Sequence, residues 1–148
     1  MKTYILTLSK SFLKNHPKAG QPTDFKRKLI EEIKIHTIRD NYELWLKRIK
    51  EVQEGKAILS IRQWSEKPYR SKQEVIMNLS AKDGVSCQCL DCDKPFALEI
   101  DGKPLKYQPE MVQLANNDGL DYDDFNSWFN IDKATGKKAI IHFTKFRY

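Results

Sequence analysis

The residues most suited to chemistry lie between positions 34 and 40, where the sequence reads Lys-Ile-His-Thr-Ile-Arg-Asp. Lys34 and Thr37 are three residues apart, so they share one side of the chain if this segment keeps a helical turn. A lysine drawn into a pocket can lose its proton and then activate the threonine hydroxyl or a water molecule. Alternatively, Lys34 and His36 are exposed and Thr37 only caps the next helix. Because such clusters are common on loops, residue chemistry alone favours this second interpretation.

A second group of side chains could bind a nucleic acid. Arg39 and Arg62 can each donate paired hydrogen bonds to phosphate oxygens. Trp64 and Tyr69 offer flat rings on which an unpaired base could stack. Trp64 could equally be a core residue at the end of a strand, because its ring is amphipathic. Tyr69 follows a proline in a polar turn, and we expect it to be exposed.

Positive charge is concentrated in the first half of the chain. Residues 1–74 contain 17 Lys and Arg against 9 Asp and Glu, whereas residues 75–148 contain 9 against 11. Such an excess suits a polyanion such as nucleic acid. A basic surface helix that only aids solubility would give the same composition, and for a net charge of +6 the charge alone favours that simpler interpretation.

Three cysteines, Cys87, Cys89 and Cys92, follow one another with the spacing Cys-x-Cys-x-x-Cys. A structural zinc ion normally requires four thiolate or imidazole ligands. The fourth would have to be one of the three histidines, and none has zinc-finger spacing. We therefore predict three reduced thiols in a turn-rich connection, no metal and no cofactor.

The periodicity of apolar residues predicts the elements that must position these side chains. The predicted strands cover residues 3–8, 57–64, 74–79, 96–100, 103–105 and 138–146. The predicted helices cover residues 25–34, 42–54, 109–116 and 121–129. This pattern indicates an α+β domain, with the strands forming a small barrel.

The length of 148 residues predicts a single domain with a core of its own. No apolar run approaches the roughly 20 residues of a membrane-spanning helix. The first residues turn polar at Ser9 and Lys10, too early for the apolar region of a secretory signal. We therefore expect a cytoplasmic protein that does not enter a membrane.

Three motifs occur in an informative order: Lys34-x-x-Thr37-x-Arg39, then Leu-Ala-x-x-Asp-Gly at 114–119, then Phe-x-x-Trp-Phe at 125–129. Together they resemble the ASCH domain family, in which the second motif reads Leu-Ala-x-x-Glu-Gly. The likeness is strongest over residues 25–79 and 108–148. It is closest to small uncharacterised ASCH-like proteins of the Bacteroidetes, which bring no known activity with them.

The resemblance implies a PUA-like fold for residues 1–148, a small mixed or mostly antiparallel β-barrel with flanking helices. It also implies a cleft at the barrel mouth for RNA or a modified nucleoside. One branch of the family consists of amidohydrolases that remove an acyl group from the exocyclic amine of cytidine with Lys, Thr and Glu. These residues correspond to Lys34, Thr37 and Asp118. Because Asp is one methylene shorter than Glu, either the backbone sits closer here or the carboxylate falls short.

The leading prediction is an RNA- or nucleoside-binding protein with a basic cleft made by Lys34, Thr37, Arg39, Arg62, Trp64 and Tyr69. The alternatives are an amidohydrolase acting on an acylated cytosine nucleoside, with Lys34, Thr37 and Asp118 as catalytic residues, and a protein-interaction module. A binding groove would be open and contain no buried acid. An enzyme would have a closed pocket in which Lys34 and Asp118 face each other.

Overall fold

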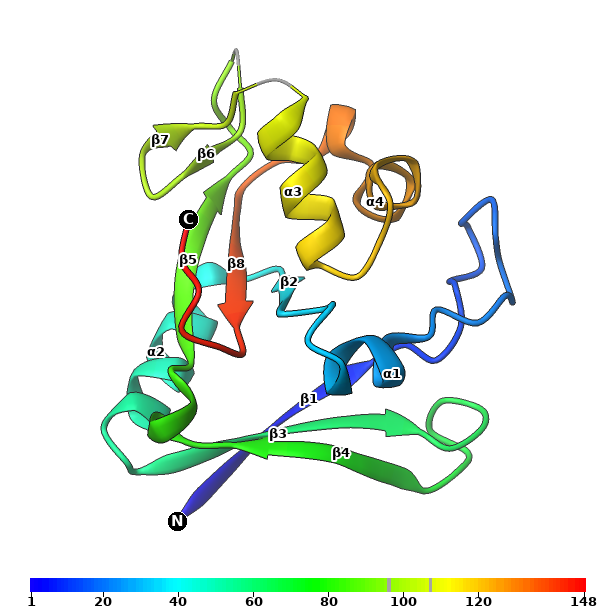
Figure 1. Cartoon of the computed structure of the whole chain (residues 1–148), viewed down its shortest axis with the longest axis vertical. Coiled ribbons are helices and arrows are strands. Elements are labelled where there is room, and N and C mark those ends of the chain that lie inside the picture. The colour runs from blue at the N-terminus through cyan, green and yellow to red at the C-terminus, as the bar shows by residue number, and fades with distance from the viewer. Residues whose placement is uncertain (96, 107) are drawn as a thin grey trace.

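The computed structural model describes residues 1–95, 97–106 and 108–148, which contain eight strands and four α-helices (Figure 1). The strands are β1 (Lys2–Leu8), β2 (His36–Arg39), β3 (Ala57–Trp64), β4 (Gln73–Leu79), β5 (Ser86–Asp91), β6 (Glu99–Ile100), β7 (Lys103–Pro104) and β8 (Lys137–His142). The helices are α1 (Phe25–Ile30), α2 (Tyr42–Gln53), α3 (Pro109–Asn117) and α4 (Tyr122–Phe129). Among the described residues, none of the helices has the length and apolar character that a membrane span requires.

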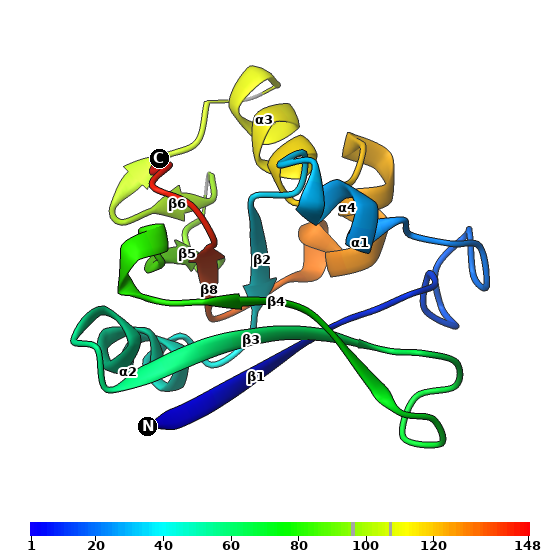
Figure 2. The ribbon, with the colours of Figure 1, turned by 60° about the horizontal axis from the view of Figure 1, so that its bottom comes forward.

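The strands form two sheets, with the orders β1-β3-β4 and β2-β8-β5-β6-β7. Figure 2 shows the three-stranded sheet on one side of the molecule and α1, α3 and α4 on the other. The predicted α+β class is confirmed. The predicted barrel is not found, because no ladder of hydrogen bonds joins the two sheets within the described parts of the chain. The pair β1–β3 is parallel and the remaining pairs are antiparallel.

The two sheets are held together by side chains. Buried apolar residues of both sheets and of the helices form one continuous core. Helix α2 contacts β3 of the first sheet and β5 and β8 of the second. Its buried residues Trp45, Ile49 and Val52 recur at helical spacing, as the sequence predicts. Burial of this apolar face therefore holds the two sheets together, although no hydrogen-bonded ladder joins them in the described parts of the chain.

Local signals placed several elements correctly. The strand predicted over 57–64 is β3, with the same bounds. Asn41 caps α2 by accepting a hydrogen bond from the backbone N–H of Leu44. Asp121 caps α4 in the same way through Asp124.

Other boundaries were predicted wrongly. Helix α1 ends at Ile30 instead of position 34, because Glu32 has a left-handed backbone with φ of 58°. The last strand ends at His142 instead of position 146. Of the strand predicted over 96–100, the structure has Glu99–Ile100, and Phe96 lies outside the described residues.

Two of the three cysteines, Cys87 and Cys89, lie on a strand and not in a turn-rich connection, and Cys92 follows the strand. Ser86–Asp91 forms β5 and pairs with β8, with Cys87 opposite Ile141. Its inward positions include Ser86 and Gln88, which are polar. This part of the sequence therefore lacks the alternation of apolar and polar residues that usually indicates a strand.

Candidate functional site

A cavity of about 440 Å³ lies between α1, the start of β2, the β3–β4 connection and α4. Lys34, Thr37, Arg39 and Asp118 all line it, although they are up to 84 positions apart in the sequence. The prediction that these four residues meet at one cavity is confirmed. The role of each residue stays a prediction.

The beginning of β2 brings the first three residues to the cavity. Because side chains alternate along a strand, Thr37 and Arg39 lie on one face of β2. Lys34 precedes the strand, where the backbone N–H of Ile35 donates to the carbonyl oxygen of Asn117 at 2.8 Å. This hydrogen bond joins the chain beside Lys34 to the end of α3, where Asp118 is the C-cap residue.

Lys34 and Asp118 form a buried pair. The ammonium Nζ of Lys34 donates to the backbone oxygen of Asp118 at 2.6 Å and lies 3.4 Å from its carboxylate Oδ1. The two side chains are only 2% and 4% exposed. The same Nζ lies 4.3 Å from the centre of the Phe25 ring, which adds a cation–π interaction. The interpretation that Lys34 is an exposed loop residue is therefore wrong.

The environment of Lys34 makes its neutral form more accessible than in an exposed lysine. Burial lowers the pKa of Lys34 from 10.5 to about 8, and the nearby Asp118 carboxylate opposes this shift. The positive charge of Arg39 lowers the pKa further. A lysine with this pKa can accept a proton near neutral pH, which an exposed lysine cannot do efficiently.

The contact also shows how the shorter acid is accommodated. The backbone oxygen of Asp118 is itself in contact with Lys34, so the backbone sits close enough for an aspartate to reach it. The carboxylate Oδ1 also lies 3.4 Å from Nζ, so the aspartate side chain does not fall short of Lys34. Gly119 contributes to this approach, because a Cβ there would lie 3.1 Å from Cβ of Lys34.

His36 is part of this cluster, and sequence reasoning missed it. Its side chain is fully buried, and its Nδ1 lies 3.2 Å from Oδ1 of Asp118. Its other ring nitrogen, Nε2, lies 2.6 Å from the hydroxyl of Tyr148. Burial lowers the pKa of His36, which keeps the ring neutral. The only sequence signal was the position of His36 inside the Lys34–Arg39 segment.

Thr37 and Arg39 both line the cavity. Thr37 is buried, and its hydroxyl makes no hydrogen bond with the described residues. Arg39 donates from one terminal nitrogen to the carbonyl oxygen of Thr7 at 2.7 Å. Its Nε is buried without a partner among residues 1–95, 97–106 and 108–148. The Thr37 hydroxyl can therefore hydrogen-bond to a ligand in the cavity, whereas Nε of Arg39 is covered by protein.

Two pairs of aromatic side chains line the cavity wall. Trp64 is half-buried and lies next to Tyr69, with 5.2 Å between the ring centres. Tyr69 is 87% exposed, as predicted. Trp128 of α4 and Phe25 of α1 form a second pair, with 5.7 Å between their ring centres. These rings can contact the faces of a flat ligand.

Arg62 does not belong to this group. It is absent from the cavity wall, and its Nε donates to the Ser60 hydroxyl at 2.9 Å. The prediction that it shares a cleft with Lys34 and Arg39 is therefore wrong. The bulge of β3 between Ile61 and Arg62 changes the register at this point, and the sequence does not reveal it.

The cysteines are free thiols on and after β5. Burial raises the pKa of Cys87 to about 12, so its thiol stays protonated. In the part of the chain that the structure describes, no three His, Cys, Asp or Glu side chains are grouped so that they could hold a metal ion. Absence of a metal remains a prediction that elemental analysis would test.

Comparison of the chain with models of protein families, with curated proteins and with solved structures gives no match. The ASCH resemblance therefore depends on the sequence motifs alone. What the cavity can do follows from its own residues.

Proposed function

We propose that the protein is an ASCH-type amidohydrolase that binds an acylated nucleoside in this cavity and removes the acyl group from its exocyclic amine. The observation that carries the proposal is the buried contact between Lys34 and Asp118 at the cavity wall. Burying two charged groups costs free energy, and such arrangements are concentrated at functional sites. A groove that only binds a ligand needs no buried acid beside a buried lysine.

The rest of the cavity fits this substrate class. Its volume lies within the range of about 300–1,000 Å³ that is typical of small-molecule sites. The Trp64 and Trp128 rings can contact a base, and the Arg39 guanidinium, which lines the cavity, can donate to a carbonyl oxygen. We extend the proposal to the fold and treat the two sheets as the separated halves of a PUA-like barrel, because residues of both enclose one core.

The chemistry is amide hydrolysis. Neutral Lys34 takes a proton from a water molecule while the water oxygen bonds to the acyl carbon. The Thr37 hydroxyl orients that water. The bond between the acyl carbon and the amine nitrogen then breaks, Lys34 returns the proton to this nitrogen, and the Asp118 carboxylate accepts a hydrogen bond from the same nitrogen. The products are the free nucleoside amine and a carboxylic acid. With a pKa of about 8, roughly one Lys34 in ten is neutral at pH 7.

The proposal is tested by incubating the protein with N4-acetylcytidine and measuring cytidine by liquid chromatography. We expect turnover, and we expect Lys34→Met to lower it by at least about 100-fold because the base is removed. Lys47→Met is the matched control, since Lys47 is exposed on α2 and does not line the cavity. If folded wild-type protein releases no cytidine from any N4-acyl cytidine, the proposal fails.

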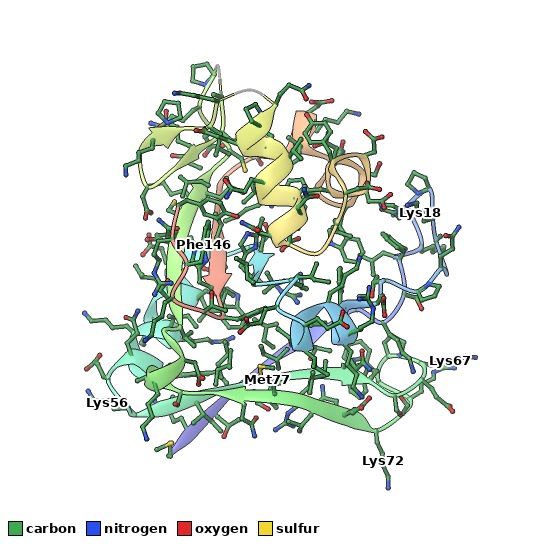
Figure 3. The ribbon with its side chains drawn as sticks, viewed as in Figure 1. Lys18, Lys56, Lys67, Lys72, Met77 and Phe146 are labelled. Carbon is green, nitrogen blue, oxygen red and sulfur yellow. The ribbon has the colours of Figure 1, made fainter. Side chains whose placement is uncertain are left out.

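A second candidate function is binding of single-stranded RNA. The connection between β3 and β4 carries the exposed Tyr69 together with the exposed cations Lys67, Arg70 and Lys72. Figure 3 shows Lys67 and Lys72 extending away from the molecule at this connection. An RNA strand could place one base in the cavity and its phosphates beside these cations.

A further inference from the structure

Behind Asp118, a row of polar side chains leads away from the cavity into the protein. His36 lies between Oδ1 of Asp118, at 3.2 Å, and the hydroxyl of Tyr148, at 2.6 Å. The amide Nδ2 of Asn117 lies 3.0 Å from the same hydroxyl. Thr37 and Lys34 lie on the cavity side of β2, so this row is a separate feature that the proposed reaction does not yet use.

The direction of each hydrogen bond in this row follows from the chemistry of the groups. The Asn117 amide nitrogen can only donate, so the Tyr148 oxygen accepts from it. The Tyr148 hydroxyl is then free to donate its own proton to Nε2 of His36. A neutral ring that accepts at Nε2 carries its proton on Nδ1, which therefore donates to the Asp118 carboxylate. With this assignment, each of the three contacts pairs one hydrogen-bond donor with one acceptor.

This assignment defines which oxygen of Asp118 a ligand can reach. Oδ1 accepts from His36 and lies beside Nζ of Lys34. Oδ2 makes no hydrogen bond with the described residues, while Asp118 itself lines the cavity. Two donors on one oxygen restrict rotation of the carboxylate group. Oδ2 is therefore the oxygen presented to the substrate amine.

We propose that His36 and Tyr148 are positioning residues for Asp118: together they fix the carboxylate with Oδ1 turned inward and Oδ2 turned toward the ligand. Neither residue lines the cavity, so both act through Asp118. The effect on turnover rests on the proposed amidohydrolase function. The hydrogen-bond assignment does not, and it can be measured without a substrate.

The first measurement is the protonation of the His36 ring by long-range proton–nitrogen NMR of the full chain at pH 7. We expect a proton on Nδ1 and none on Nε2. The ionisable groups that surround this ring are Asp118, Lys34, Tyr148 and His142. Burial lowers the pKa of His142 to about 3, so His142 is neutral and does not add charge. A proton on Nε2 of His36 would overturn the inference, and this measurement requires no variant.

The second measurement uses Tyr148→Phe, which removes only the hydroxyl. The hydroxyl donates to the unprotonated Nε2 and so favours the neutral ring; its loss is expected to raise the titration midpoint of His36 by about one pH unit. Tyr122→Phe is the matched control, because the Tyr122 hydroxyl makes no hydrogen bond with the described residues and should leave His36 unchanged. An equal midpoint in wild type and Tyr148→Phe would contradict the assignment.

The third measurement is the kinetics of the same variants on N4-acetylcytidine. Tyr148→Phe should lower kcat by about tenfold with little change in KM, because the acid is misplaced while the binding surface is intact. A variant that changes KM alone would refute the positioning role. If the wild type shows no turnover but His36 has its proton on Nδ1, the amidohydrolase function fails and the hydrogen-bonded row stands.

Discussion

The ionisation of Lys34 sets the pH at which the proposed chemistry can occur. Burial lowers its pKa to about 8, so the neutral, proton-accepting form increases as the pH rises through this value. We expect kcat/KM for N4-acetylcytidine to rise about tenfold per pH unit below 7 and to level off above about 9. A pH series of initial rates checks this. A profile that is flat between pH 6 and 9 would exclude Lys34 as the base.

Lengthening the acid tests how tightly the buried pair is built. The backbone oxygen of Asp118 contacts Lys34 at 2.6 Å, and the Asp118 side chain is only 4% exposed. In Asp118→Glu the added methylene therefore has to fit into a space that is already filled. We therefore expect turnover to fall, on the order of tenfold, and the free energy of unfolding to decrease. Rates and urea unfolding measure the two effects. An increase in turnover would instead mean that the shorter carboxylate limits the reaction.

Residue types could be predicted at this site, but their surroundings could not. The sequence placed Lys34, Thr37 and Asp118 correctly at one cavity through their likeness to a motif. It did not reveal that Lys34 is buried. The burial depends on the Phe25 ring, which lies over the ammonium group, and on Gly119, whose lack of a side chain leaves room for Lys34. The partner of His36 at its Nε2 is 112 positions away. Contacts of this kind depend on the pairing of strands, which local patterns do not specify.

At the scale of elements, the turn after α3 determines how closely Asp118 approaches Lys34. Gly119 has a left-handed backbone, with φ of +86°, and a Cβ there would lie 3.1 Å from Cβ of Lys34. Gly119→Ala should therefore decrease the free energy of unfolding by about 2 kcal/mol or more, from backbone strain and from steric overlap. It should also lower turnover, because Lys34 must move.

Gly136 provides the matched control for this change. It too has a left-handed backbone, with φ of +80°, but no atom of the described residues beyond its chain neighbours lies within 4 Å of a Cβ built there. Gly136→Ala should cost about 1 kcal/mol from strain alone and leave turnover unchanged. Urea unfolding of both variants gives the comparison. Equal destabilisation would mean that the contact between Gly119 and Lys34 is unimportant.

Elements with regular apolar patterns were predicted well, and irregular ones were not. Strand β3 and helix α2 bury apolar residues at strand and helix spacing, and their bounds agree with the prediction to within about one residue. Strand β5 buries Ser86 and Gln88, so its pattern is typical of a loop. Helix α1 ends early because of the backbone at Glu32, and no residue type signalled this.

The arrangement of the whole molecule was the least predictable feature. The sequence indicates strands but does not specify their partners, and the expected barrel requires a continuous ladder. The structure instead pairs β1 with β3 in parallel, through a crossover that contains α1, β2 and α2. The packing of α2 against both sheets then makes one core from two separate ladders. Which strands pair over such a distance depends on how the apolar residues of all elements are buried together in one core.

The distribution of charge over the whole molecule leads to a prediction for RNA. The first half of the chain carries the excess of Lys and Arg, and the β3–β4 connection exposes Lys67, Arg70 and Lys72 beside the cavity. If these cations bind phosphates, the affinity for single-stranded RNA should fall steeply with salt. Arg70→Ala should weaken binding for all sequences and reduce the slope of log K against log salt by about 0.7.

Fluorescence anisotropy with a labelled oligonucleotide at several salt concentrations measures this slope. Lys47→Ala removes one exposed cation from α2, away from the cavity, and should leave the slope unchanged. A strand that enters the cavity should also compete with N4-acetylcytidine, because Tyr69 and Trp64 would contact its base. Affinity that does not change with salt, or an equal effect of Lys47→Ala and Arg70→Ala, would exclude RNA binding through the β3–β4 connection. The amidohydrolase proposal would then concern free nucleosides alone.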